Sequence, residues 1–181
     1  MKSWKLILII VAAVIAVVLM FVFAFQGVQN KAINLEEQIT TAQSEIKIQE
    51  KRRADLIPNL VDCVKAYDEH EYKTLMGVIE ARGTNSDQAA AEITTMINAV
   101  AEQYPQLKSN ENYKQLMTEL SATENLIAQT RTNYNTWVTQ YNSYVRKFPN
   151  SGILNMLGYE RQSFEKLTFE VSSDAPTDLF D

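Results

Sequence analysis

The fold is decided by the stretch from Tyr113 to Phe148, YKQLMTELSATENLIAQTRTNYNTWVTQYNSYVRKF. Its apolar residues recur at alternating steps of four and three, the heptad-like, coiled-coil spacing of a helix that buries one face. Two charged residues stand within this stripe, whose members are Tyr113, Met117, Leu120, Glu124, Ile127, Arg131, Tyr134, Val138, Tyr141, Val145 and Phe148. The pattern predicts one long helix that ends at Pro149-Asn150-Ser151-Gly152.

The sequence on either side of this stretch predicts further helices. Lys31 to about Arg82 has apolar positions mostly three or four residues apart and predicts one long helix. Pro58 inside it predicts a kink, with a helix break at Ile57 as the alternative. Gln88 to Gln103 predicts a short helix, and Ile153 to Phe169 predicts a shorter fourth one.

The composition agrees with an all-α fold. The chain of 181 residues contains only 5 Gly and 4 Pro, whereas all-β folds need many tight turns. We expect residues 26–170 to form one helical domain of three long or medium helices and a short fourth one. Residues 171–181 are acidic and are expected to form a disordered tail.

A membrane helix is expected at residues 6–25, LILIIVAAVIAVVLMFVFAF, which contain no charge, Gly or Pro. As a helix this run spans roughly 30 Å, the thickness of a bilayer's hydrocarbon core. The alternative is a cleaved signal peptide, but the apolar part of such a peptide is usually about 7–15 residues long. Residues 1–5 form a short basic flank with Lys2 and Lys5. The positive-inside rule therefore predicts a single-pass protein of the cell membrane, with a cytoplasmic N-terminus and an extracytoplasmic domain.

Several classes of function lack the residues that they need. A net charge of -5 argues against binding to nucleic acid. With one cysteine, Cys63, and one histidine, His70, the chain offers neither a multi-cysteine metal site nor a two-histidine zinc site. Asp68 to Glu71 is a dense polar cluster, but consecutive residues on a helix point in different directions and cannot converge on one ion. We therefore predict no catalytic, cofactor-binding or metal-binding residues, no small-molecule substrate and no enzymatic activity.

Four charges lie within the apolar stripes. Glu124 and Arg131 interrupt the stripe of residues 113–148, and Arg53 and Glu71 interrupt that of residues 31–82. Because a buried charge is costly unless it is paired, these four are predicted to form a structural ion-pair network. If the bundle runs up, down and up, its first and third helices are parallel. That arrangement predicts a Glu71–Arg131 pair with Glu124 nearby, and the alternative is that these side chains reach water at the rim of wide stripes.

Two Tyr-Asn pairs, Tyr134-Asn135 and Tyr141-Asn142, recur seven residues apart. Residues at this spacing lie on one face of a helix. The two tyrosines belong to the apolar stripe and the two asparagines stand beside it. The four residues are a candidate interaction surface, with packing and hydrogen bonding inside the protein as the alternative.

Six blocks of the sequence, in their order along the chain, resemble the LemA family of bacterial membrane proteins. They are KRRADLIPNLV (51–61), VKAYDEHE (64–71), AR (81–82), YPQLKSNENYKQL (104–116), ELSATENLIAQTRTNYNTWVTQYN (119–142) and KFPNSGILNMLGY (147–159). The resemblance implies a helical up-and-down bundle. Family members usually carry a Tyr-Asn pair just after the anchor, where this chain has Gln29-Asn30, so no role of an aromatic residue is carried over to that point.

The resemblance implies an adaptor or scaffold, because some family members are associated with membrane metalloproteases and others with magnetosome membranes. The leading hypothesis is a membrane-anchored interaction protein that contacts the lipid bilayer through residues 6–25 and binds other membrane proteins or copies of itself. The alternative is a structural homo-oligomer that coats or shapes membrane. An enzyme ranks third, because it would need a polar cleft with convergent titratable residues.

Overall fold

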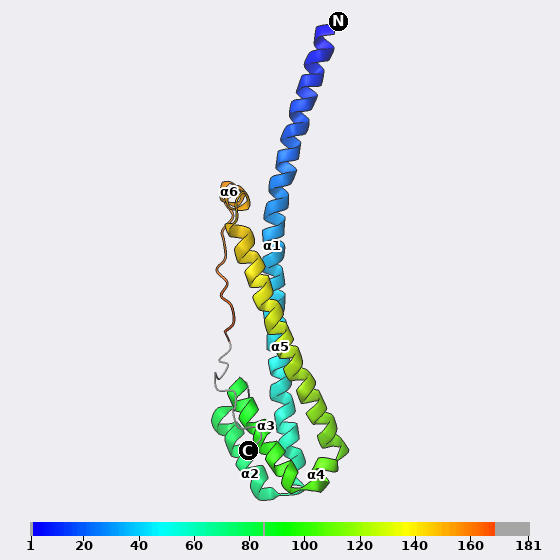
Figure 1. The fold of residues 1–181 in the computed structure, drawn as a ribbon, viewed down its shortest axis with the longest axis vertical. Coiled ribbons are helices and arrows are strands. Elements are labelled where there is room, and N and C mark those ends of the chain that lie inside the picture. The colour runs from blue at the N-terminus through cyan, green and yellow to red at the C-terminus, as the bar shows by residue number, and fades with distance from the viewer. Residues whose placement is uncertain (1, 85, 169–181) are drawn as a thin grey trace, which may run out of the picture. The chain divides into compact units, whose positions relative to one another are not determined.

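The protein is all-helical in a computed structural model that describes residues 2–84 and 86–168. The helices are α1 (Lys2–Lys65), α2 (Glu69–Arg82), α3 (Asp87–Gln103), α4 (Pro105–Ser109), α5 (Glu111–Arg146) and α6 (Asn150–Met156) (Figure 1). The described part of the chain contains no strand, so the predicted all-α fold is confirmed. The predicted tail at residues 171–181 lies outside the described residues.

α1 contains the apolar run and continues without a break into packed sequence. All residues from Ile7 to Ala24 are exposed, whereas Ala32, Leu35 and Ile39 are buried. The first part is apolar on every side, as in a helix surrounded by lipid, and the later part is apolar along one stripe. The change in pattern marks where the helix begins to pack against the rest of the protein.

The first helix predicted for the bundle is two helices in the structure. α1 ends at Lys65 rather than near Arg82, and α2 follows after a short turn. Asp68 begins α2 because its side chain accepts hydrogen bonds from two backbone N–H groups of the first turn, at 2.8 and 3.0 Å. Such a cap satisfies donors that have no partner inside the helix. Apolar spacing continues across this turn, so the pattern alone predicted one helix.

α1 passes through Pro58 as a helix, so the break considered at Ile57 is absent. Proline lacks an N–H group, which removes the helical partner of the Ala54 carbonyl. The hydroxyl of Thr84, from the turn between α2 and α3, lies 3.5 Å from that carbonyl oxygen and donates to it. The Thr84 hydroxyl therefore replaces the backbone donor that Pro58 lacks, through a long hydrogen bond.

The turn between α2 and α3 depends on two small residues. Gly83 has φ 71° and ψ −174°, a conformation essentially restricted to glycine, and its N–H donates to the Ile79 oxygen at 2.7 Å. The Ser86 side chain then caps α3 by accepting from the Ala89 N–H at 3.2 Å. Glycine after α2 and serine before α3 are the residue types that a helix stop and a helix cap require.

The long helix predicted from the 4-3 stripe is present as α5. The predicted fourth helix at residues 153–169 is not; α6 is shorter and begins earlier, at Asn150. Gly158 has φ 68° and follows its end, and residues 159–168 have no regular secondary structure. Tyr159 and Phe164 in this segment are therefore partly buried without belonging to a helix.

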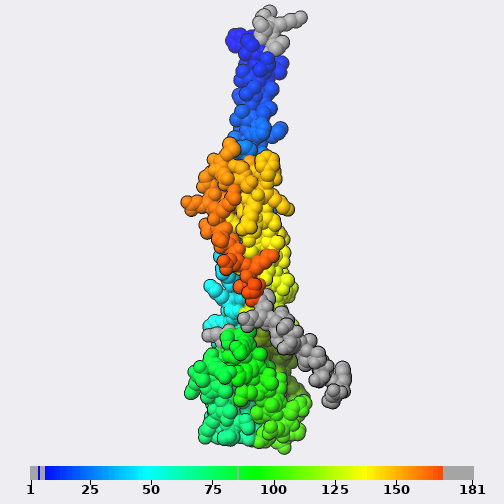
Figure 2. Space-filling view, turned by 60° about the vertical axis from the view of Figure 1, so that its left-hand side comes forward, coloured from blue at the N-terminus to red at the C-terminus, as the bar shows by residue number. Residues whose placement is uncertain are grey.

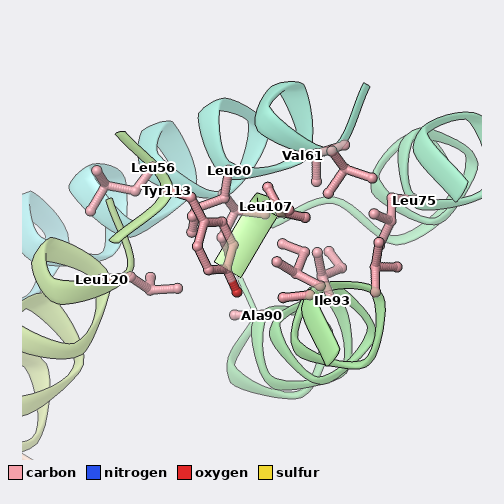
Figure 3. Packing of buried hydrophobic residues seen from close by; sticks show 14 residues of the cluster. Leu56, Leu60, Val61, Leu75, Ala90, Ile93, Leu107, Tyr113 and Leu120 are labelled. Atoms are coloured by element: carbon pink, nitrogen blue, oxygen red, sulfur yellow. The ribbon is translucent and has the colours of Figure 1, made fainter. Parts of the chain in front are cut away.

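The described residues belong to two compact units. The bundle unit is Thr41–Asn133, and the anchor unit is made of Met1–Thr40 and Tyr134–Asp181. In the bundle unit, residues of α1, α2, α3, α4 and α5 share one core; Figure 3 shows Leu60, Ile93 and Leu107 among its side chains. Figure 1 shows α2 and α3 beside each other in this unit.

In the anchor unit, α1 and α5 lie side by side in opposite directions. The Tyr141 hydroxyl donates to Glu36 at 2.9 Å, and the Tyr144 hydroxyl donates to the Val28 backbone oxygen at 3.3 Å. The residue with the higher number on α5 contacts the residue with the lower number on α1, so the two helices are antiparallel. The C-terminal end of α5 therefore points toward the apolar run. The buried Val138, Tyr141 and Val145 show that α5 packs here with the predicted stripe.

Candidate functional site

A buried cation lies in the bundle unit. Arg53 of α1 is 1% exposed, although arginine is almost never fully buried without a partner. Its Nη1 donates to Oδ1 of Asp87 at 2.8 Å and lies 3.4 Å from both carboxylate oxygens of Glu124. The three residues come from α1, α3 and α5, so one guanidinium group connects three helices.

A second arginine completes this cluster. Arg131 binds Asp87 through both ends of its guanidinium group, with Nη1–Oδ2 at 2.6 Å and Nη2–Oδ1 at 3.1 Å. Its Nη2 also donates to Glu50 at 2.6 Å. Such bidentate pairs are stronger and more directional than single ionic contacts. The hydrogen bonds from Arg131, and then those from Arg53, hold the pKa of the Asp87 carboxyl below its ordinary value.

The structure brings together Arg53, Glu124 and Arg131 of the four predicted network residues, and it places Glu71 elsewhere. Glu71 is in the first turn of α2, at the opposite end of the α2–α3 hairpin from Asp87. The prediction of a Glu71–Arg131 pair assumed parallel first and third helices. The chain turns back after residue 65 instead, and the ion pairs of α5 with α1 show that these two helices are antiparallel.

Two members of the cluster were missed by the sequence prediction. Glu50 lies three residues before Arg53, a spacing that puts both on the same side of α1. Asp87 belongs to neither apolar stripe, and 44 positions separate it from Arg131 in the sequence, so no pattern indicated the contact. The five charged residues form a clamp, here called the charge clamp: Glu50, Arg53, Asp87, Glu124 and Arg131.

The two Tyr-Asn pairs hold a segment of the same chain, residues 161–168, here called the return segment. Asn135 binds the backbone of Leu167 twice, accepting from its N–H at 2.8 Å and donating to its oxygen at 2.9 Å. The Tyr134 hydroxyl donates to the Glu165 oxygen at 3.1 Å. These bonds all involve main-chain atoms of the segment, so they do not depend on the identity of its side chains.

The second pair acts in the same way. The Asn142 side chain donates to the Phe164 oxygen at 3.2 Å, and the Tyr141 hydroxyl accepts from the Gln162 N–H at 2.9 Å. The rings of Tyr141 and Phe164 meet edge to face with centroids 5.2 Å apart. The structure thus places all four predicted surface residues on one face of α5, where the return segment occupies them.

A phenol–carboxylate cluster lies beneath this face, and the sequence prediction did not find it. Oε1 of Glu36 accepts hydrogen bonds from the hydroxyls of both Tyr141 and Tyr159. Burial, followed by the hydrogen bond to Glu36, raises the pKa of the Tyr159 hydroxyl far above its ordinary value. The three residues connect α1, α5 and the chain beyond α6, and they are too far apart in sequence to be recognised as a motif.

Other residues with chemical potential are placed as ordinary structural groups. Burial, with a smaller contribution from Asp62, raises the pKa of the Cys63 thiol, so the reactive thiolate is disfavoured. Within residues 2–84 and 86–168, no group of three or more His, Cys, Asp or Glu side chains is arranged to hold a metal ion. A shallow open groove of about 550 Å³ beside α3 and α5 is lined in part by Ala101 and Met117.

One described helix is long and apolar enough to cross a membrane. It is α1, in which an 18-residue window has a mean hydropathy of 3.4 and none of the window is buried. A signal sequence near an N-terminus has the same properties, and the structure contains no membrane. The fold and this helix define a class: a helical protein whose described residues include one candidate membrane-crossing segment.

Comparisons with known proteins give the family. The family model described as "LemA family" matches residues 42–178, which is most of the chain. Protein LemA of Metamycoplasma hominis is 30% identical over 140 residues, covering 71% of this chain and 64% of the relative. The chain belongs to the LemA family.

Other relatives match a smaller region. Magnetosome protein MamQ 2 of Paramagnetospirillum magneticum is 36% identical over 66 residues, and magnetosome protein MamQ of Magnetospirillum gryphiswaldense is 33% identical over 66 residues. Each match covers 36% of this chain and 24% of the relative. The chain thus matches less than two thirds of the length of these curated relatives.

Proposed function

We propose that this protein is a membrane-anchored helical interaction or scaffold protein without catalytic activity of its own. The observation that carries the proposal is the contrast along α1, where Ile7 to Ala24 are exposed and the residues from Ala32 onward follow a buried stripe. So large an apolar surface is unfavourable in water and suits the hydrocarbon core of a bilayer. The anchor restricts the bundle to partners at the membrane.

The partner class that fits best is another membrane protein, such as a membrane metalloprotease, which the anchored helical bundle would serve as an adaptor. The charge clamp supports this role because it fixes three helices of the bundle unit relative to one another. A binding surface that is already rigid loses less conformational entropy when a partner binds. We further propose that the N-terminus is cytoplasmic and the bundle extracytoplasmic, as the basic residues of the N-terminal flank suggest.

The test is purification of the tagged full chain in mild detergent, with identification of the proteins that copurify. We expect a specific membrane protein at a constant ratio, and the reverse purification from that protein should recover this chain. The matched control is a variant in which the sequence of residues 6–25 is scrambled, which keeps its hydrophobicity. If the scrambled variant still copurifies the membrane protein, the contact is made by the bundle. If only nonspecific contaminants copurify with the native chain, the proposal is contradicted.

The second candidate is a structural homo-oligomer that coats or shapes membrane. The similarity of part of the chain to magnetosome proteins favours it. Cross-linking in intact membranes distinguishes the two candidates, because this one requires large arrays of the chain alone. An adaptor gives instead a discrete species that contains a second protein.

A further inference from the structure

The end of the anchor unit where α5 leads into α6 exposes large apolar side chains. Phe148 is 88% exposed, Met156 is 77% exposed and Leu157 is 38% exposed. Phe148 continues the 4-3 stripe of α5, so the sequence predicted that it would be buried with the other members. Single exposed apolar residues are common, but several within one short turn and helix mark a contact surface. We call residues 147–157 the tip.

The contacts of Tyr144 place the tip near the apolar run of α1. Its hydroxyl donates to the Val28 backbone oxygen at 3.3 Å, and Nζ of Lys31 lies 5.1 Å from the centre of its ring. Val28 comes three residues after Phe25, the last residue of the run, which corresponds to about 5 Å of helix. α5 points toward the run and ends two residues after Tyr144, at Arg146. The tip therefore begins at the level where the apolar run ends.

The surface view agrees with this placement. Figure 2 shows α6, in orange, at the lower end of the bare blue part of α1, within the anchor unit. A bilayer that surrounded the exposed residues up to Ala24 would have its interfacial layer at this level.

We propose that the tip rests in the interfacial layer of the membrane that α1 enters, with Phe148 and Met156 in contact with lipid. The inference rests on the proposed membrane anchor and adds a second lipid contact to it. An interfacial contact of this kind buries apolar side chains at the boundary between headgroups and acyl chains. It explains why the stripe of α5 extends one step beyond its last buried member, Val145.

The charges around the tip fit a lipid surface better than a second protein surface. Lys31, Arg146, Lys147 and Arg161 are exposed, and Glu160, next to Arg161, is an exposed acid. Arg161 is held at the tip by hydrogen bonds to the Ser151 oxygen and the Asn155 side chain, at 3.1 and 2.9 Å. Basic side chains around an apolar centre are attracted to anionic headgroups.

The experiment uses the full chain in vesicles made of equal parts of phosphatidylcholine and phosphatidylglycerol. Three single-tryptophan proteins are compared, each with the other native tryptophans replaced by phenylalanine. One keeps Trp4 and reports on the anchor; the second carries Phe148→Trp at the tip. The third carries Gln140→Trp and is the matched control, because Gln140 is also exposed but lies farther back on α5. Brominated lipid and aqueous iodide quench tryptophan from opposite sides.

We expect the Phe148→Trp protein to show blue-shifted emission, loss of fluorescence with brominated lipid and protection from iodide. The Gln140→Trp control should show the opposite, and the protein that keeps Trp4 should be quenched by brominated lipid. If Phe148→Trp unfolds the chain, as judged by circular dichroism, Met156→Trp gives the same readout.

Two results would overturn the inference while leaving the anchor intact. The first is quenching by iodide at position 148 as strong as at position 140, with Trp4 still quenched by lipid. The second is blue-shifted emission at position 148 without lipid quenching, which would mean that protein covers the tip. If Trp4 is not quenched by lipid and the chain fails to float with the vesicles, the proposed anchor falls together with the inference.

Discussion

Asp87 is the residue on which the charge clamp depends most, because it is the acid that both arginines share. It is half-exposed, with 55% of its side chain open to water, whereas Arg53 is 1% and Arg131 is 14% exposed. Replacing Arg53 leaves carboxylates that water can solvate. Replacing Asp87 leaves buried guanidinium groups with weaker partners, which is the more costly change. The acid, rather than the buried cation, should therefore be the more sensitive position.

A double-mutant cycle with Asp87→Asn and Arg131→Met tests this pairing. We expect a coupling free energy of about 1–3 kcal/mol, between the values for exposed and buried ion pairs. The measurement is denaturant unfolding of the full chain in detergent. Because the pKa of Asp87 is lowered in the folded state, its contribution is present above its unfolded pKa of about 3.9 and is lost as the pH falls through the folded value.

The matched control cycle combines Glu71→Gln with Arg131→Met. Glu71 lies at the other end of the hairpin, so the two changes should add to within about 0.5 kcal/mol. A control coupling as large as that of the Asp87 cycle would show that the original Glu71–Arg131 prediction describes the solution structure better.

Tyr159 should make the stability of the protein sensitive to alkaline pH. Its pKa is raised in the folded state, chiefly by burial and then by the bond to Glu36, so folding favours the neutral phenol. The stabilisation is complete below the unfolded pKa of about 10 and is lost as the pH rises above it. We expect Tyr159→Phe to reduce the fall in unfolding free energy between about pH 10 and 11. An unchanged slope in Tyr159→Phe would contradict this, and Tyr72→Phe, outside the cluster, is the control.

At the scale of elements, the α2–α3 hairpin offers a matched pair of glycines. Gly83 needs a positive φ, whereas Gly77 is inside α2, and a Cβ at either position would meet no atom within 4 Å. Gly83→Ala should therefore destabilise the protein by about 1–3 kcal/mol through backbone strain alone. Gly77→Ala should stabilise it by about 0.5–1 kcal/mol, because alanine is the better helix former. Thermal unfolding of the two variants should shift in opposite directions, and a shift in the same direction would refute the assignment.

The sequence predicts an element well when the signal for that element lies within a short stretch of the chain. The 4-3 stripe predicted α5 because burial on one face repeats along a single helix. Gly83 and Ser86 have the residue types of a turn, a local signal that needs no knowledge of distant contacts. The turn after Lys65 was missed because the apolar spacing is the same on both sides of it.

The partners in the site were beyond sequence reasoning for a different reason. Asp87 meets Arg131 across 44 positions, and Tyr159 meets Glu36 across 123. Such contacts depend on the relative direction of the packed helices and on which residues lie at the same height. The sequence analysis assumed parallel first and third helices and therefore paired Arg131 with Glu71, whereas α1 and α5 are antiparallel. The Tyr-Asn repeat lies on the face of α5 that holds the return segment, and that segment has no periodic signal in the sequence. Its use as a surface for other proteins stays a prediction.

At the scale of the whole molecule, the proposed anchor would decide where the protein acts. We expect the mature protein to retain residues 1–25, because the apolar run is longer than that of most signal peptides. Intact-mass measurement of membrane-extracted protein checks this directly. A mass that corresponds to a start near Phe25 would make the protein a secreted one, and the adaptor proposal would then have to be abandoned.

The orientation in the membrane is a separate prediction. A reporter that is active only outside the cytoplasm, fused after Asp181, should be active, because the basic flank with Lys2 and Lys5 favours a cytoplasmic N-terminus. Exchange of both lysines for glutamate should lower that activity and raise the signal of a cytoplasmic reporter at the same position. A cytoplasmic signal from the unmodified flank would reverse the orientation.

The manner in which α5 holds the return segment also bears on how the gene can change. Asn135, Asn142 and Tyr134 bind only backbone atoms of the segment, which every amino acid except proline presents alike. We therefore expect substitutions at Gln162, Glu165 and Lys166 to be accepted. Few substitutions should be accepted at Asn135, because its side chain makes two hydrogen bonds to the segment. A saturation library should recover nearly every amino acid at the first three positions and few at Asn135. These three positions are thus places in the coding sequence where new features can arise without loss of the fold, whereas Phe164 is held by its ring contact with Tyr141.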